Sequence, residues 1–199
     1  KIKFLPDPII SKTEIKSLKQ KKVNLNFKLK KNSFFLCIGR LTKQKNHKLL
    51  ISLYKNYKIK EKLIIIGEGE LRKNLIKLIQ KFKLEKKIIL LNYQKNIFYY
   101  ISRAKAVVIA SLWEDPGFVM IESAFAKKPI ICSDCPSGPK EFIGKNRGGF
   151  LFKSNSLISL IDTFDKFSKS NKTELNKKIS YAKKKSNNYT IENHTKIIR

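Results

Sequence analysis

Residues 33–67 read SFFLCIGRLTKQKNHKLLISLYKNYKIKEKLIIIG. Two short apolar runs, at 33–38 and 63–66, flank a segment at 46–57 whose apolar residues recur at helical spacing. Continuous rather than alternating hydrophobicity indicates strands that are buried on both faces, which is typical of a parallel sheet covered by helices. The stretch therefore predicts a strand–helix–strand unit in which a glycine directly follows each strand.

The same alternation continues along the rest of the chain. Further short apolar runs lie at 87–91, 106–110, 129–132 and 149–152. Helical patterns lie at 70–82, 96–102 and 118–127, and two or three more helices are expected after Ser154. Such alternation gives an α/β domain with a Rossmann-like, doubly wound parallel sheet of about six strands, in which ligands bind at the carboxyl ends of the strands.

The length and composition suit one globular domain, since 42% of the 199 residues are hydrophobic. The chain starts at Lys1 rather than at methionine, and residues 1–10 contain two X-Pro steps, which favour extended backbone. We therefore expect a piece of a longer protein, with an interdomain linker and lead-in at 1–32 and the folded domain with its C-terminal helices at 33–199. The sequence shows no bilayer-spanning apolar run and no cleavable leader, so we expect a cytoplasmic protein.

The charge is strongly basic, with 44 Lys and Arg against 15 Asp and Glu and a formal net charge of +29. Such an excess favours attraction to phosphates and anionic headgroups, so peripheral contact with the inner face of the plasma membrane is expected. The basic residues are spread over the whole length without a recognition motif, so specific nucleic-acid binding is not expected. A non-catalytic basic module that binds nucleic acid stays open as an alternative.

The loop after the first strand, GRLTKQKN at 39–46, combines a glycine with cations just before a helix. Gly39 allows the backbone to approach a ligand closely, and Arg40 and Lys45 lie beside the free N–H groups of a helix terminus. The loop predicts a diphosphate site. A solvated basic turn stays open, because the chain is rich in lysine.

Two other motifs fall short of their usual chemistry. The loop GEGELR at 67–72 has Arg72 where a dinucleotide fingerprint needs its third glycine, so only a tight turn is predicted there. Cys132 and Cys135 form a C-x-x-C, but zinc needs two further ligands and the chain's two histidines are remote in sequence. We therefore expect neither a metal nor a cofactor.

The stretch ASLWEDPGFVMIESAFA at 110–126 follows a buried strand, turns at a Pro-Gly pair and opens a helix. Glu122 lies among apolar residues, so its carboxylate needs a hydrogen-bond donor from a ligand or from the backbone. Glu114 lies in the loop, near the free backbone N–H groups of Gly117 and Phe118. Two acids around an anion-favouring helix start suit a phosphorylated, hydroxyl-rich ligand such as a nucleotide sugar, while a backbone-capped core glutamate and a solvated loop glutamate stay open.

These motifs resemble, in order, those of the retaining glycosyltransferases of family 4 (group 1), which have two Rossmann-like domains in the GT-B arrangement and build lipopolysaccharide, capsule and other bacterial glycans. The resemblance covers residues 33–152. It rests on Gly39-Arg40-Leu41 with Lys45, on residues 66–72, on the E-x7-E element from Glu114 to Glu122 and on residues 129–141. It implies that this chain is the C-terminal, donor-binding half of a GT-B enzyme.

The resemblance also implies roles for individual residues. Arg40 and Lys45 would bind the donor diphosphate, Glu122 would receive the ribose hydroxyls, and Glu114 would contact the donor sugar at the catalytic centre. The base would lie near residues 93–96. The remaining donor-binding positions that the resemblance implies are Gly39, Gly67, Tyr93, Lys95, Asn96, Gly117, Phe118 and Val119.

The activity implied is transfer of a hexose-type sugar from a nucleotide sugar, with a UDP-sugar expected, to a glycan or lipid-linked acceptor in surface polysaccharide biosynthesis. The family's acceptor domain, with its usual catalytic histidine, precedes the part that this chain resembles, so we expect the 199 residues alone to be inactive. Asp115-Pro116 stands where a glycine commonly follows the first acid. A nucleotide-sugar epimerase of the same architecture stays open, although the ordered cations and acids favour a transferase.

Overall fold

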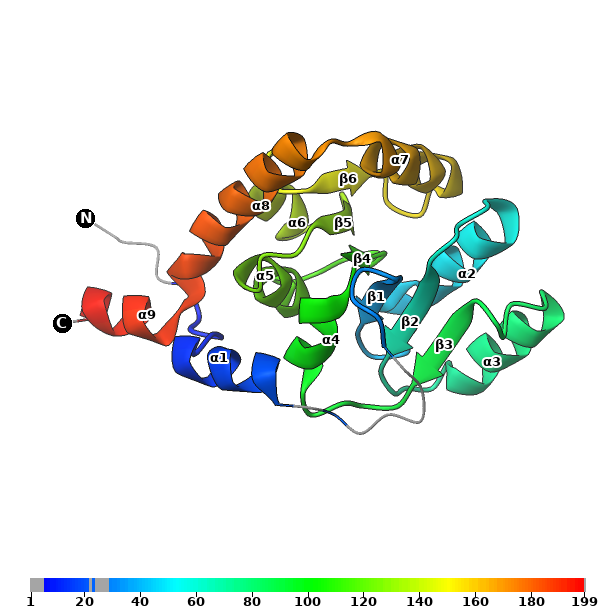
Figure 1. Ribbon diagram of the computed structural model, residues 1–199, viewed down its shortest axis with the longest axis horizontal. Helices are drawn as coiled ribbons and strands as arrows, with labels where there is room; N and C mark the ends of the chain where they lie inside the picture. Colours follow the sequence, from blue (N-terminus) through cyan, green and yellow to red (C-terminus); the bar gives the residue numbers. More distant parts are fainter. Residues whose placement is uncertain (1–5, 22, 24–28, 199) are drawn as a thin grey trace.

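The computed structural model describes residues 6–21, 23 and 29–198 of the chain. Six parallel strands form one sheet in the order β3-β2-β1-β4-β5-β6 (Figure 1). The strands are β1 (Phe34–Ile38), β2 (Lys62–Ile66), β3 (Ile88–Leu91), β4 (Ala106–Ile109), β5 (Ile130–Ser133) and β6 (Phe150–Phe152). This order is that of the doubly wound Rossmann-like fold, so the predicted α/β class and its parallel sheet are confirmed.

Helices cover both faces of the sheet (Figure 1). One face carries α2 (His47–Asn56), α3 (Arg72–Lys81) and α7 (Leu157–Lys169). The other carries α1 (Lys12–Gln20), α4 (Ile97–Arg103), α5 (Phe118–Phe125), α6 (Pro139–Ile143) and α8 (Lys172–Ser186). The chain also forms the short turns η1 (Lys43–Lys45) and η2 (Asn187–Tyr189) and ends in α9 (Ile191–Ile198), so three α-helices follow Ser154 as predicted.

Strand β1 is apolar throughout because both of its faces are buried. Phe35 and Cys37 belong to the core under α2 and α7, whereas Phe34 and Leu36 belong to the core under α4 and α5. Successive side chains of a strand point to opposite faces, and here both faces are buried under helices. A continuous apolar run is therefore what this position in the sheet requires.

Helix α1 lies in a segment where the sequence analysis places no helix. Ser11 Oγ accepts a hydrogen bond from the backbone N–H of Glu14 at 3.3 Å, and Ile10 and Ile15 are buried on either side of this cap. Ser-x-x-Glu with flanking apolar residues is a capping box with a hydrophobic staple, which is the signal that predicts this helix. Residues 1–5, 22 and 24–28 of the expected linker lie outside the described residues.

The N-terminal segment is attached to the C-terminal end of the chain. Ile10 pairs with Thr190 as an isolated parallel bridge, and the N–H of Ile191 donates to the carbonyl of Ile10 at 2.9 Å. Figure 1 accordingly shows α1 between α9 and α4. Residues 9–18 are thus packed onto the same domain.

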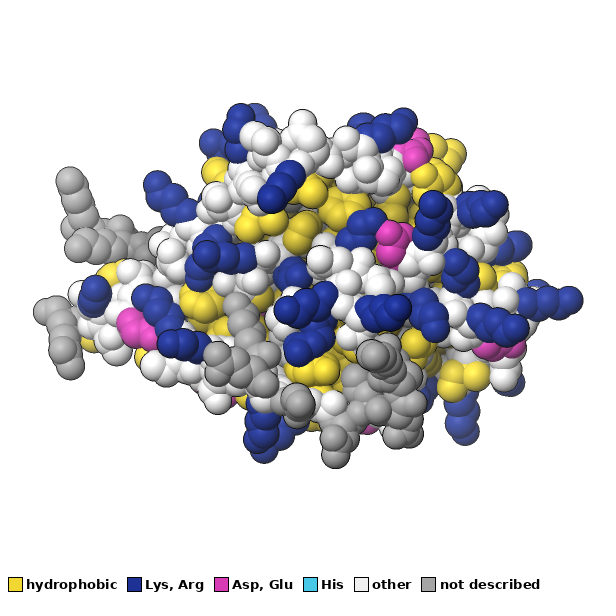
Figure 2. Space-filling view, in the orientation of Figure 1, with side chains coloured by type: hydrophobic (Ala, Val, Ile, Leu, Met, Phe, Trp, Pro, Cys, Tyr) yellow, Lys and Arg dark blue, Asp and Glu magenta, His cyan; other side chains and the backbone are white. Residues whose placement is uncertain are grey.

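Basic side chains are scattered over the molecular surface, as the face in Figure 2 shows, with only a few acidic side chains between them. This distribution agrees with the even spread of lysine along the sequence. Among the helices that the structure describes, none combines the length and the apolar character needed to cross a bilayer.

The loops after β1 and β2 lie backbone against backbone at the carboxyl edge of the sheet. The N–H of Gly39 donates to the carbonyl of Ile66 at 3.0 Å. A Cβ atom on Gly67 would lie only 1.9 Å from the carbonyl oxygen of Gly39, and one on Gly69 would lie 2.6 Å from that of Leu41. Glycine at both positions is therefore what allows the first loop to take its place.

We expect Gly67→Ala to lower the free energy of unfolding by about 3 kcal/mol or more, because the added methyl overlaps a backbone oxygen that cannot move without separating the two loops. Gly39→Ala is the matched control, since its Cβ would meet only the flexible side chain of Lys45, at 3.3 Å. We expect this control to cost less than about 1 kcal/mol. Urea unfolding followed by circular dichroism compares the two, and equal losses would contradict the packing described here.

Candidate functional site

Two cavities open at the carboxyl edge of the sheet, where the strand order reverses between β1 and β4. The first, which we name the Glu114 pocket, has a volume of about 400 Å³ and is lined by residues that include Arg40, Lys45, Glu114, Gly117, Phe118 and Val119. The second, the Glu122 pocket, has a volume of about 530 Å³ and is lined by residues that include Gly39, Arg40, Gly67, Tyr93, Lys95 and Glu122. Ligands of doubly wound folds bind at this reversal of strand order.

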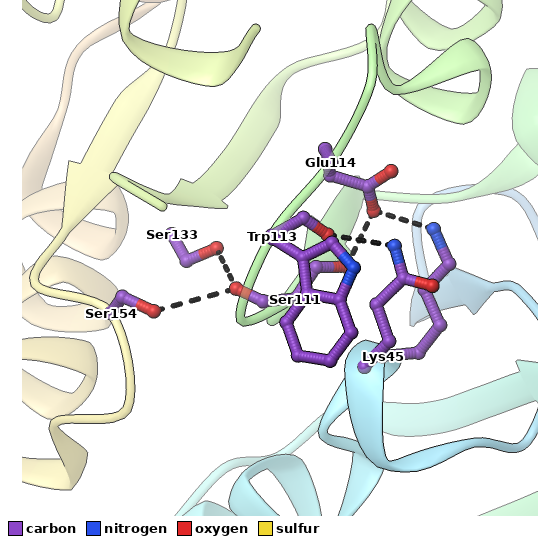
Figure 3. Close-up of polar contacts among 7 residues, drawn as sticks. Lys45, Ser111, Trp113, Glu114, Ser133 and Ser154 are labelled. Atoms are coloured by element: carbon purple, nitrogen blue, oxygen red, sulfur yellow. Dashed lines mark hydrogen bonds and ion pairs between the residues drawn. The ribbon is translucent and has the colours of Figure 1, made fainter. Parts of the chain in front are cut away.

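Glu114 is only 6% exposed, yet two donors reach its carboxylate. Lys45 Nζ donates to Glu114 Oε1 at 2.6 Å, and Ser111 Oγ donates to the same oxygen at 2.5 Å (Figure 3). A buried carboxylate costs several kcal/mol unless such partners compensate it. Because Lys45 follows β1 and Glu114 follows β4, their ion pair joins the two strands between which the strand order reverses.

Side-chain hydroxyl and amide groups form hydrogen bonds with backbone carbonyls of the loop after β4. Ser133 Oγ, at the end of β5, donates to the carbonyl of Ser111 at 2.6 Å, and Ser154 Oγ lies 3.5 Å from the same oxygen (Figure 3). The side-chain amide of Gln44 donates to the carbonyl of Trp113 at 2.9 Å. No sequence pattern marks these residues, because serine and glutamine are common in loops.

The Glu114 pocket also collects groups that favour an anion. Gly117 has a positive φ of 87° and starts α5, so the free N–H groups of Phe118 and Val119 belong to the first helical turn beside the pocket. Arg40 has an exposed side chain and, among the described residues, forms no ion pair. Arg40 lines both pockets, so its guanidinium is available where they meet.

Glu122 has a different environment from Glu114. Its carboxyl makes no hydrogen bond or ion pair with another residue in the described part of the chain, so the backbone cap considered from the sequence is not formed. Burial raises the pKa of this carboxyl to about 7. When it ionises, the donor that it needs must therefore come from a ligand or from solvent.

The segment after β3 contributes unequally to the Glu122 pocket. Tyr93, which is 70% exposed, and Lys95 line it. Asn96 lines neither pocket: its side-chain oxygen caps α4 by accepting from the N–H of Tyr99 at 3.2 Å, and its amide donates to the carbonyl of Leu18 at 2.8 Å. Of the predicted donor-binding residues, Asn96 is thus the one whose side chain is committed to packing between α1 and α4.

Helix α1 forms one wall of the Glu122 pocket, which the sequence analysis did not anticipate. Ser11, Glu14 and Leu18 line the cavity together with the residues of the sheet edge. The capping box at the start of α1 is a local signal for the helix, but its position against the pocket depends on packing with α4.

Among the described residues, the buried thiols and the buried histidine do not join these carboxylates in a group that could bind a metal ion. Burial raises the pKa of the free thiols of Cys132 and Cys135, and Cys132 lines the Glu114 pocket. His47, at the start of α2, is 1% exposed, and its pKa is lowered to about 4 by burial and by the charge of Lys45. No group of three or more His, Cys, Asp or Glu side chains within the described residues is arranged to hold a metal ion.

The protein family described as glycosyl transferases group 1 matches residues 19–186 of the chain. The chain belongs to this family. It is 36% identical to the N-acetylgalactosamine-N,N'-diacetylbacillosaminyl-diphospho-undecaprenol 4-alpha-N-acetylgalactosaminyltransferase of Campylobacter jejuni. The match extends over 156 residues and covers 77% of this chain and 43% of that protein. It is 33% identical over 131 residues to the amylovoran biosynthesis glycosyltransferase AmsD of Erwinia amylovora, which covers 65% and 37%.

The fold of this group 1 chain is also that of solved structures. A crystal structure of Anabaena Alr3699/HepE in complex with UDP matches it with a TM-score of 0.77 and 19% sequence identity, over 95% of this chain and 52% of that chain. At this identity the match concerns the fold. The chain spans less than half of the length of the two curated relatives named above.

The E-x7-E element of the group 1 chain divides its two acids between the two pockets. Glu114 faces the first pocket from the loop after β4, and Glu122 faces the second from α5. Arg40 lines both cavities, so the two pockets share one cation.

We expect Glu122 to make the stability of the protein depend on pH. The ordinary pKa of this carboxyl is 4.5, but it is about 7 in the folded protein. Between these values the folded state holds a proton that the unfolded state has lost, so the free energy of unfolding falls as the pH rises. The loss is complete above the folded-state pKa and amounts to roughly 3 kcal/mol at most.

Glu122→Gln removes this titration while it keeps the volume of the side chain. Urea unfolding of both proteins between about pH 5 and about pH 8 measures the effect. The variant should gain stability relative to the wild type as the pH rises through this window. A constant difference would show that the carboxyl is not held in the buried, unpartnered state described above.

Proposed function

We propose that this chain is the donor-binding domain of a retaining glycosyltransferase that transfers a sugar from a UDP-sugar to a glycan or lipid-linked acceptor in surface polysaccharide biosynthesis. The observation that carries the proposal is the pair of pockets that share Arg40, one with the Lys45–Glu114 pair and the other with the unpartnered Glu122. A nucleotide sugar has the matching order of groups, with hydroxyls at each end and a diphosphate between them.

The diphosphate would lie near the shared Arg40. Lys45 Nζ has three N–H donors, of which Glu114 uses one, so the ammonium can keep its ion pair while it binds a phosphate oxygen. The free N–H groups at the start of α5 add further donors. These fixed positive groups would stabilise the charge that develops on the leaving diphosphate, and for this reason we expect no requirement for a divalent metal.

The nucleoside would occupy the Glu122 pocket. Ribose hydroxyls are donors, and the ionised Glu122 carboxylate is the acceptor that lacks a protein partner. The base would then lie toward the exposed ring of Tyr93 and toward Lys95. UDP is the nucleotide that we propose, because the Anabaena structure with the same fold is a complex with UDP.

The donor sugar would lie in the Glu114 pocket, where the fixed carboxylate can accept hydrogen bonds from its hydroxyls. A glycan or lipid-linked acceptor is supported by the names of the relatives, one of which is a diphospho-undecaprenol galactosaminyltransferase and the other an amylovoran biosynthesis enzyme. Membership of the group 1 family supports a transferase over the epimerase considered from the sequence. In a retaining transfer, the leaving phosphate would help to deprotonate the acceptor on the same face of the sugar.

The excess positive charge supports peripheral contact with an anionic membrane face, where a lipid-linked acceptor would be found. We expect the protein to sediment with phosphatidylglycerol vesicles and not with phosphatidylcholine vesicles at low salt. Raising the salt concentration should release it, because the basic residues are dispersed and screening acts on each of them. Equal sedimentation with both vesicles would count against this location.

We expect UDP to bind this chain in EDTA, and Arg40→Ala to weaken the binding by about 1.5 to 3 kcal/mol, the range for a hydrogen bond to a charged group. Isothermal titration calorimetry measures both. Lys43→Ala is the matched control, because Lys43 is an exposed cation of the same loop that lines neither pocket. Equal losses of binding free energy in the two variants would show that the loop is only a solvated basic turn.

The same titrations in Glu122→Gln test the ribose position. Wild-type affinity should improve, relative to the variant, as the pH rises through about 7, because only the ionised carboxylate accepts both hydroxyls. The phosphate has its own titration near pH 6, which both proteins share and which therefore cancels in the comparison. Parallel pH profiles for the two proteins would exclude Glu122 from the nucleoside site. Lys45→Ala is less informative, since it also leaves Glu114 without its cation.

A further inference from the structure

In the part of the chain that the structure describes, the large aromatic side chains that are exposed lie at the carboxyl edge of the sheet. Among the described residues, eight large hydrophobic side chains are exposed, and the three aromatic ones are Tyr93, Trp113 and Phe118. Tyr93 lines the Glu122 pocket, whereas Trp113 and Phe118 line the Glu114 pocket. The chain has one Trp, seven Tyr and 13 Phe, so this concentration of exposed rings at two cavities marks a surface that contacts something else.

The backbone of Trp113 is held firmly although its indole is 50% exposed. Its carbonyl accepts from the side-chain amide of Gln44 at 2.9 Å, and the N–H of Leu112 donates to the backbone carbonyl of Gln44 at 2.8 Å. On its other side, the N–H of Glu114 donates to the carbonyl of Pro136 at 3.2 Å. An aromatic ring on a fixed backbone presents a rigid apolar face, which lowers the entropy cost of binding.

The two rings lie further out than the groups that would hold the donor sugar. Glu114 is 6% exposed, whereas Trp113 is 50% and Phe118 is 48% exposed. Figure 3 shows the indole beside Lys45 and Glu114. The proposed donor sugar is held through its diphosphate by the inner cations. The outer edge of the pocket, which carries the indole of Trp113 and the phenyl ring of Phe118, is therefore available to a second sugar.

A further cavity continues from this rim. Asp115, whose side chain is exposed, lines both the Glu114 pocket and a cavity of about 490 Å³ that we name the Tyr189 pocket. The lining of the Tyr189 pocket includes the polar side chains of Ser137, Glu141, Lys185, Asn188 and Tyr189 beside the apolar Pro116 and Phe142. The two cavities thus form a track that passes the aromatic rim and continues past one shared carboxylate.

We propose that Trp113 and Phe118 are a stacking platform for a sugar ring of the acceptor, and that the acceptor glycan continues past Asp115 into the Tyr189 pocket. This rests on the proposed function, because it takes the donor sugar to be bound at Glu114. The C–H faces of a pyranose pack on aromatic rings, and its hydroxyls donate to the exposed carboxylate of Asp115. The donor-binding domain would then contribute to acceptor recognition.

The chemistry of the track favours a neutral glycan over the other parts of a lipid-linked acceptor. In the Tyr189 pocket, two carboxylates, those of Asp115 and Glu141, stand against one cation, Lys185, so the charges of this part of the track do not favour a diphosphate. A polyprenyl chain needs a continuous apolar groove, whereas polar side chains interrupt the apolar surface here. Alternating aromatic faces and hydrogen-bonding groups match the alternating C–H faces and hydroxyls of an oligosaccharide.

Trp113 is the only tryptophan of the chain, so indole fluorescence reports on this position alone. The protein is saturated with UDP-N-acetylgalactosamine, which fills both donor pockets, and is then titrated with the methyl glycoside of an α-1,4-linked N-acetylgalactosamine disaccharide. We expect a second, saturable change in the emission. Calorimetry with UDP-N-acetylgalactosamine alone, on the same sample, reports on the donor site independently.

Variants are compared by saturation-transfer NMR of the disaccharide, which does not depend on the indole. Trp113→Ala should weaken its binding by about fivefold or more, and Trp113→Phe should restore it to within about twofold, because an aromatic face is what the platform supplies. Ile158→Ala is the control, since Ile158 is exposed on α7 and lines neither the Glu114 pocket nor the Tyr189 pocket. This control should bind like the wild type.

The outcomes separate the platform from the proposed function. A disaccharide signal that appears with UDP but disappears with UDP-N-acetylgalactosamine would place a sugar ring of the disaccharide in the donor-sugar position. That result would overturn the proposed stacking platform. Normal binding of the UDP-sugar without any disaccharide signal would overturn the platform and leave the proposed function standing. If neither UDP nor UDP-N-acetylgalactosamine binds, both are overturned.

Discussion

The ion pair between Lys45 and Glu114 is the interaction on which the site depends. A carboxylate that is 6% exposed needs a compensating charge, and the cation comes from the loop after the neighbouring strand. That loop turns sharply at Asn46, which has a positive φ of 48°, and lies against the loop after β2 where Gly67 leaves room for its backbone. Backbone packing between β1 and β2 therefore sets the electrostatics of a carboxylate that follows β4.

The two acids of the E-x7-E element are held in opposite ways. Glu114 has its cation and a serine hydroxyl before any ligand arrives, so the protein fixes its position in advance. Glu122 has no partner among the described residues, and burial raises its pKa to about 7. The unliganded protein tolerates this carboxyl because it can take up a proton, and a ligand that offers hydroxyl donors favours its ionised form. The first pocket is thus preorganised, whereas the second responds to what occupies it.

The sequence predicts the sheet well because each strand is apolar on both faces, and that pattern depends only on local residue order. Arg40, Lys45 and Glu114 are candidates because they lie in loops that follow predicted strands, whereas Glu122 is one because it is a charged residue in an apolar helical stretch. Helix α1 was missed although Ser11 and Glu14 have the spacing of a capping box and Ser11 caps the helix, because two X-Pro steps before them indicate a linker. The contacts of Ser111, Gln44 and Asn96 depend on partners far away in the chain, which no single-sequence pattern reveals.

The arrangement of charges, rather than the formal net charge of +29, decides which polyanion this site selects. A field of that size attracts nucleic acid and nucleotides alike. Within the two pockets, however, Lys45 is paired with Glu114, and Arg40 lines the Glu114 pocket and the Glu122 pocket alike. A nucleic-acid strand carries a phosphate at every residue and would bring charges against both carboxylates, whereas a nucleotide sugar carries its charge only in the middle and hydroxyls at both ends. If the chain acts as proposed, the two carboxylates would therefore disfavour the first ligand by repulsion, while their acceptor oxygens would suit the hydroxyls of the second.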